Sequence, residues 1–129
     1  MSTITTAVIR FVPLSVCFLL GCGGSGLEGK WRGTVGEMTV EANIETDLGK
    51  AVQGVLTLGN PRCFNNGQLS GSIANTSVSL GASGSGSASQ TTVVQITGER
   101  SGDTITGFFS MTGAGSECTV PRTEITLRR

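Results

Sequence analysis

"WRGTV", residues 31–35, carries a five-residue pattern that the chain repeats: an apolar residue, a polar residue, a glycine, any residue and another apolar residue. The pattern returns in "VQGVL" (52–56), "LSGSI" (69–73) and "ITGFF" (105–109), with a partial copy, "ITG", at 96–98. Because side chains alternate between the two faces of a strand, each glycine shares a face with the apolar residue two positions before it. We therefore predict one common direction for Gly33, Gly54, Gly71, Gly98 and Gly107 and their apolar partners Trp31, Val52, Leu69, Ile96 and Ile105.

These repeated glycines indicate how strongly the strands are curved. A glycine inside a strand weakens it unless the strand must bend sharply or another group must come close. One such glycine in each of several strands predicts a strongly curved sheet, and closing that sheet into a barrel also removes exposed edges. A barrel of about eight strands has an interior that is just filled by side chains or holds one small ligand.

Period-two alternation accompanies the repeat, and no convincing helical period appears after residue 26. The segment "EMTVEANIE" (37–45) places its apolar residues on one face and its charged or polar residues on the other, as a strand with one solvated face does. The stretch 83–90, "SGSGSASQ", is expected as a flexible hairpin connection. Other strands are expected, between turn signals, at 29–35, 51–58, 67–73, 77–82, 91–99, 103–111 and 122–128.

The fold that these patterns predict is all-β: a small antiparallel up-and-down meander barrel of about eight strands with one disulfide. The chain has four cysteines and no histidine. The two that remain after the N-terminal region, Cys63 and Cys118, are expected to pair. Closing their loop of about 56 residues corresponds to about 4 kcal/mol in the chain-entropy account. No metal site is expected, because two cysteines without histidine do not complete a tetrahedral zinc site.

The N-terminus has the features of an export signal. Residues 11–20, "FVPLSVCFLL", are too short to cross a bilayer, which takes about 20 residues, but suit the core of a signal peptide. The run ends in Leu19-Leu20-Gly21-Cys22, which resembles the lipobox of bacterial lipoproteins. That resemblance implies cleavage before Cys22 and lipid attachment to its thiol. The alternative is a plain signal peptide with an incidental cysteine.

The resemblance to lipoproteins also divides the chain. It implies a signal peptide at 1–21, a lipidated cysteine with a flexible tether at 22–26, and a barrel domain at 27–129. The protein would be exported and anchored to a membrane by lipid. Because Gly23 rather than aspartate follows Cys22, the same resemblance favours the outer membrane of a bacterium with two membranes.

A second resemblance concerns the first strand. "LEGKWRGTV" (27–35) resembles the opening strand of the calycin group, which includes lipocalins, fatty-acid-binding proteins and avidins: a glycine, one residue and then a tryptophan, here Trp31. The group implies that a basic residue of the last strand packs over this tryptophan, and Arg128 or Arg122 would take that place. Trp31 would then fill one end of the barrel or, alternatively, contact a ligand. The repeated glycine pattern, the lipobox and the late disulfide also resemble those of uncharacterised bacterial lipoproteins.

Composition argues against several functions. Nine basic and nine acidic residues balance, so no basic patch suggests nucleic acid. Catalysis usually relies on histidine or on paired carboxylates in a cleft, and the glycine-serine runs lack the context of a phosphate loop, so neither enzyme nor cofactor is expected. We therefore expect a membrane-anchored structural or interaction module of the cell envelope, with a protein or glycan partner. The alternative is a carrier that holds a small apolar ligand inside a calycin-like barrel.

Overall fold

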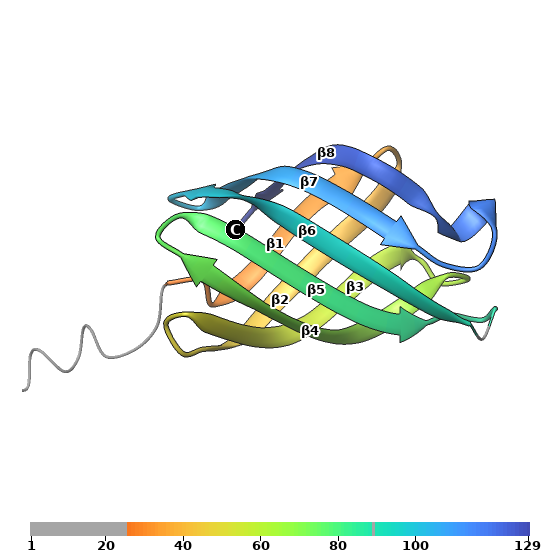
Figure 1. Ribbon diagram of the computed structural model, residues 1–129, viewed down its shortest axis with the longest axis horizontal. Coiled ribbons are helices and arrows are strands. Elements are labelled where there is room, and N and C mark those ends of the chain that lie inside the picture. The colour runs from red at the N-terminus through yellow and green to blue at the C-terminus, as the bar shows by residue number, and fades with distance from the viewer. Residues whose placement is uncertain (1–25, 89) are drawn as a thin grey trace, which may run out of the picture.

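The computed structural model describes residues 26–88 and 90–129, which form a closed β-barrel (Figure 1). The predicted signal peptide, Cys22 and most of the tether lie outside the described residues. Neighbouring strands are antiparallel and follow one another around the barrel in chain order, so the predicted up-and-down topology is confirmed. The described elements are β1 (Gly29–Val35), β2 (Met38–Asp47), β3 (Ala51–Asn60), β4 (Phe64–Ala74), β5 (Ser77–Ser85), β6 (Thr91–Ser101), β7 (Thr104–Thr112), the 3-10 helix η1 (Ser116–Cys118) and β8 (Val120–Arg128).

The glycines of the repeat point into the barrel, as predicted. Gly54 stands opposite Ile44 of β2 and Leu69 of β4, and both of these side chains are buried. A methyl group built on Gly54 would overlap the carbonyl oxygen of Asn43 in β2. Gly98 and Gly107 face each other directly across β6 and β7, and a side chain on either would strike the other strand. The repeat therefore allows adjacent strands to curve closely past each other.

The hairpin connection predicted at 83–90 is shorter in the structure. β5 continues to Ser85, which pairs with Thr91 at the start of β6, so the connection is 86–90. The small residues here leave room for an aromatic side chain: a methyl group on Gly84 would lie 3.2 Å from the ring of Phe64, which is fully buried. The packing of Gly84 against Phe64 thus explains why β5 extends into the low-complexity segment, and the connection begins after Ser85.

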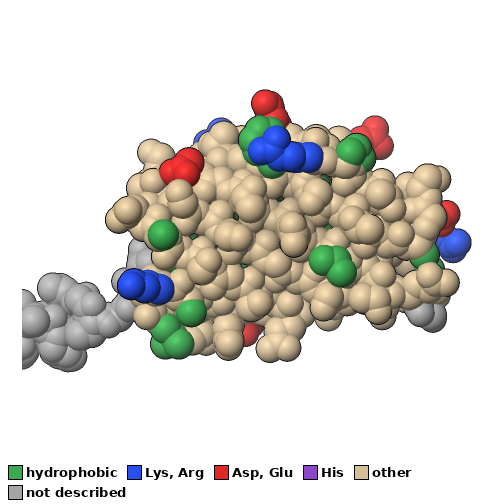
Figure 2. All heavy atoms as spheres, in the orientation of Figure 1, with side chains coloured by type: hydrophobic (Ala, Val, Ile, Leu, Met, Phe, Trp, Pro, Cys, Tyr) green, Lys and Arg blue, Asp and Glu red, His purple; other side chains and the backbone are tan. Residues whose placement is uncertain are grey.

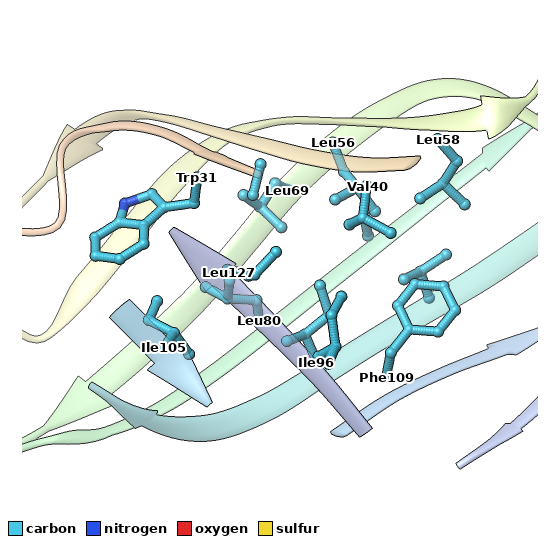
Figure 3. Close-up of a cluster of buried hydrophobic side chains, with 14 of the residues drawn as sticks. Trp31, Val40, Leu56, Leu58, Leu69, Leu80, Ile96, Ile105, Phe109 and Leu127 are labelled. Atoms are coloured by element: carbon cyan, nitrogen blue, oxygen red, sulfur yellow. The ribbon is translucent and has the colours of Figure 1, made fainter. Parts of the chain in front are cut away.

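The interior is filled by one cluster of buried apolar side chains to which all the strands contribute (Figure 3). Trp31 lies at one end of the side chains labelled in Figure 3 and Phe109 at the other. The largest fully buried side chains include Trp31, Phe64, Phe109, Leu27 and Leu56. No helix among the described residues is long and apolar enough to cross a membrane.

The disulfide closes the end of the barrel that lies opposite the start of β1. Cys63, in the turn between β3 and β4, is bonded to Cys118 at the end of η1, with their Cα atoms 5.4 Å apart and both residues buried. Beside it, Arg62 and Glu117 form an exposed ion pair with a 2.5 Å separation. Exposed pairs of this kind stabilise little, so the covalent bond is the main link between these loops.

A substitution in the repeat tests the close approach of the strands. We expect Gly107→Ala to destabilise the barrel by about 1–3 kcal/mol or more, because the added methyl group meets backbone rather than a movable side chain. Urea unfolding measured by circular dichroism gives this value.

Gly81→Ala in β5 is the matched control. Its methyl group would find its nearest neighbour, the carbonyl oxygen of Val94, 3.9 Å away. We expect a change within about 0.5–1 kcal/mol, since alanine is slightly better than glycine inside a strand. Equal losses for the two variants would show that the repeat does not mark close strand approach.

Candidate functional site

The barrel end at which β1 begins holds Trp31 and the residues that contact it. We call it the tether end: it comprises residues 26–28, the turns at 48–50, 75–76 and 102–103, and Arg129. In Figure 1 it is the end near which the C-terminus is marked. Antiparallel topology in chain order brings these turns together, because alternate connections lie at the same end.

Trp31 closes this end from inside. Its side chain is 1% exposed, and its Nε1 donates a 2.8 Å hydrogen bond to the carbonyl oxygen of Leu27. The guanidinium carbon of Arg129 lies 4.6 Å from the ring centroid and that of Arg100 lies 5.9 Å away. A cation at these distances is attracted to the face of an indole ring. Trp31 is therefore a plug in the end of the barrel, covered by positive charge.

The expectation that Arg128 or Arg122 covers Trp31 is wrong. Arg128 follows the buried Leu127 in β8, so strand alternation turns it outward, and it is exposed. Arg122 lies instead over the ring of Phe108, 3.7 Å from its centroid. The same alternation that excludes Arg128 would have selected Arg129, two residues after Leu127. It would also have selected Arg100, two residues after Gly98.

The arginines over Trp31 also hold the chain where it enters the barrel. Arg129 Nη1 donates hydrogen bonds to the carbonyl oxygens of Gly26 (2.5 Å) and Glu28 (2.9 Å). Arg100 Nη2 donates to the same Gly26 oxygen at 3.0 Å. Asp103 Oδ1 accepts from Nε and Nη2 of Arg129 at 3.0 and 2.7 Å, which fixes the guanidinium plane. The last residue of the expected tether is thus bonded to the barrel.

A buried carboxylate provides a further attachment. Asp47, at the end of β2, is 8% exposed, and its Oδ2 accepts a 2.8 Å hydrogen bond from the backbone nitrogen of Leu27. Its Oδ1 accepts from the backbone nitrogen of Gly49 at 3.0 Å. Between them, Leu48 is 72% exposed. The sequence carries no signal that marks Asp47 or Leu48 as site residues, because the Asp47 carboxylate bonds to Leu27, 20 residues earlier in the chain.

The outer face of β4–β7 has a different character. Between Ala51 and Gly98 the sequence contains one charged residue, Arg62. Figure 2 views this side of the barrel, where charged side chains lie mostly near the margins. A groove of about 530 Å³ crosses these strands, with Ser79, Thr97 and Phe108 among its lining.

One acid borders this groove. The hydroxyl groups of Thr76 and Ser77 donate hydrogen bonds to the Glu99 carboxylate at 2.7 and 2.8 Å, and they hold the pKa of Glu99 below its usual value. Glu99 is therefore a fixed, ionised hydrogen-bond acceptor. The groove combines this acceptor with hydroxyl groups and the ring of Phe108, over which Arg122 lies.

Comparison with protein-family models, curated proteins and solved structures finds no match for this chain. The closed barrel of antiparallel strands, with a buried tryptophan in β1, is compatible with a calycin-like barrel. Within residues 26–88 and 90–129, no group of three or more cysteine or acidic side chains is placed to hold a metal ion.

Removing the covering guanidinium tests the role of Arg129. Arg129→Ala removes the nearer of the two cations over Trp31 and the hydrogen bonds from Arg129 to Gly26 and Glu28, so we expect a loss of about 1–3 kcal/mol. Arg128→Ala, the neighbouring exposed arginine, should change stability by less than about 0.5 kcal/mol. Urea unfolding of the chain without its signal peptide, followed by Trp31 emission, compares them. A larger loss of stability for Arg128→Ala than for Arg129→Ala would show that Arg128, not Arg129, covers Trp31.

Proposed function

We propose that this protein is a lipid-anchored component of the bacterial cell envelope and that its barrel is a non-enzymatic interaction module. The observation that carries the proposal is the sequence Leu19-Leu20-Gly21-Cys22, which follows an apolar run and stands four residues before the point where the barrel holds the chain. Two or three acyl chains make a stable membrane anchor, whereas one is marginal.

The filled interior supports a role for the outer surface. Side chains from all the strands meet inside the barrel, with Leu56, Phe64 and Phe109 wholly buried among them. A carrier needs space for its ligand inside the barrel. No observation of the described residues favours a carrier function, so the carrier stays a prediction from the sequence. The groove over β4–β7 offers an accessible surface instead, and its hydroxyl groups suit a glycan or an uncharged protein surface.

A non-enzymatic role is supported by the chemistry of the groove. Glu99 is ionised and held by two hydroxyl groups, which suits hydrogen bonding but not donation of a proton. The chain has no histidine to act as a base.

The outer membrane is the favoured location. Gly23 rather than aspartate follows Cys22, and the resemblance to bacterial lipoproteins then favours the outer membrane. Binding of nucleic acid is not proposed, because acidic and basic residues balance.

Replacement of the lipobox cysteine tests the anchor. In cells labelled with a palmitate analogue, Cys22→Ser should abolish labelling and release the exported protein from the membrane fraction. Cys17→Ser is the matched control, because Cys17 lies in the same apolar run but would be removed with the signal peptide. It should leave labelling unchanged. Labelling of Cys22→Ser at the parent level would refute lipidation at this residue.

A further inference from the structure

We propose that the tether end of the barrel docks on the membrane that holds the acyl chains of Cys22, and that Leu48 is the side chain that enters the lipid. This inference rests on the lipid anchor proposed above and goes beyond it. An anchor on a flexible tether leaves the orientation of the barrel open, whereas docking would fix it with the tether end against the lipid and the disulfide end away from it.

The length of the tether limits how far the barrel can stand from the lipid. Only Gly23, Gly24 and Ser25 separate Cys22 from Gly26, so a fully extended chain reaches about 14 Å. Gly26 itself is not part of a free linker, because its carbonyl oxygen accepts hydrogen bonds from Arg100 and Arg129. The tether end must therefore lie close to the headgroups, and it is the nearest part of the barrel to them.

Leu48 is presented beside this point of entry. It stands in the turn between β2 and β3, where its backbone nitrogen donates to the carbonyl oxygen of Ala51 at 2.9 Å. The carboxylate of Asp47 accepts from Gly49 in the turn and from Leu27 in the chain that enters the barrel. One buried carboxylate thus ties the exposed leucine to the residue that follows the tether. Lys50, exposed in the same turn, can meet lipid phosphate groups.

Because this turn is already ordered, one leucine is enough to orient the tethered barrel on the membrane. Leu48 is 72% exposed while the hydrogen bonds of Asp47 and Leu48 fix the turn, so docking need not order a loop. An isolated leucine would not hold a soluble protein on a membrane. A tethered barrel is already at high effective concentration near the surface, and a weak second contact then biases its orientation strongly.

Tryptophan substitution reports directly on insertion. Full-length, lipid-modified Leu48→Trp and Val93→Trp proteins are reconstituted into phosphatidylethanolamine–phosphatidylglycerol vesicles with or without brominated acyl chains. Val93 is the matched control: it is 43% exposed and lies near the start of β6, toward the opposite end of the barrel. Each variant is compared with the parent, whose only tryptophan is Trp31.

The expected result is an extra quenched, blue-shifted emission component in Leu48→Trp, with at least about twofold greater quenching than in Val93→Trp, because only residues below the headgroups meet the bromines. Equal quenching of the two variants in protein whose Cys22 carries lipid by mass spectrometry would overturn docking and leave the anchor intact. Unmodified Cys22 in this protein would overturn the proposed function and the docking with it.

Discussion

The seam between β1 and β8 is the constraint on which the rest of the barrel depends. Among the described residues, β1 pairs with β2 at seven positions, but with β8 its register is defined at Arg32 and Arg128. Gly33 lets the backbone of Thr126 come close, because any side chain there would strike its carbonyl oxygen. Arg129 then joins the end of β8 to the carbonyl oxygen of Glu28, just before β1. Side-chain contacts thus add to the pairing of β1 with β8 that closes the barrel.

The same residues connect the seam to the proposed anchor. Arg129 covers Trp31 and bonds to Gly26, so the plug of the barrel and the end of the tether share one guanidinium group. Asp47 adds a second attachment through Leu27. Force on the lipid anchor would therefore act on the closed, packed end of the barrel. The groove over β4–β7 lies on the side of the barrel, where a partner can reach it without disturbing the seam.

Much of this fold follows from short-range patterns in the sequence. Alternation located the strands, the glycine repeat indicated inward-facing close approach, and cysteine counting found the Cys63–Cys118 bond. The prediction for Arg128 is wrong because the calycin resemblance implies a basic residue near the end of the last strand but does not say which face of the strand it takes. Side chains alternate between the two faces, so Arg129, two residues after the buried Leu127, points inward, and Arg128 points outward. The sequence alone places the start of the low-complexity segment, 83–85, in a loop because the packing partner of Gly84, Phe64, is about 20 residues away.

Other features could not be read from the sequence in advance. The bonds from Asp47 to Leu27 and Gly49 depend on how the barrel brings the entering chain beside a turn 20 residues later. The outer groove depends on the side-chain rows of β4–β7, whose register follows from closure of the whole sheet. Local patterns fix which face a residue takes, but not which distant residue it meets.

The burial of Trp31 in the intact chain tests the account most directly, because the chain contains no other tryptophan and no tyrosine. The measurement is its emission maximum and its quenching by acrylamide, before and after unfolding in urea. A sealed seam predicts blue-shifted emission that acrylamide barely quenches until the protein unfolds. Red-shifted, freely quenched emission from the native protein would show that Trp31 is exposed, and it would contradict both the closed tether end and the seam that Arg129 completes.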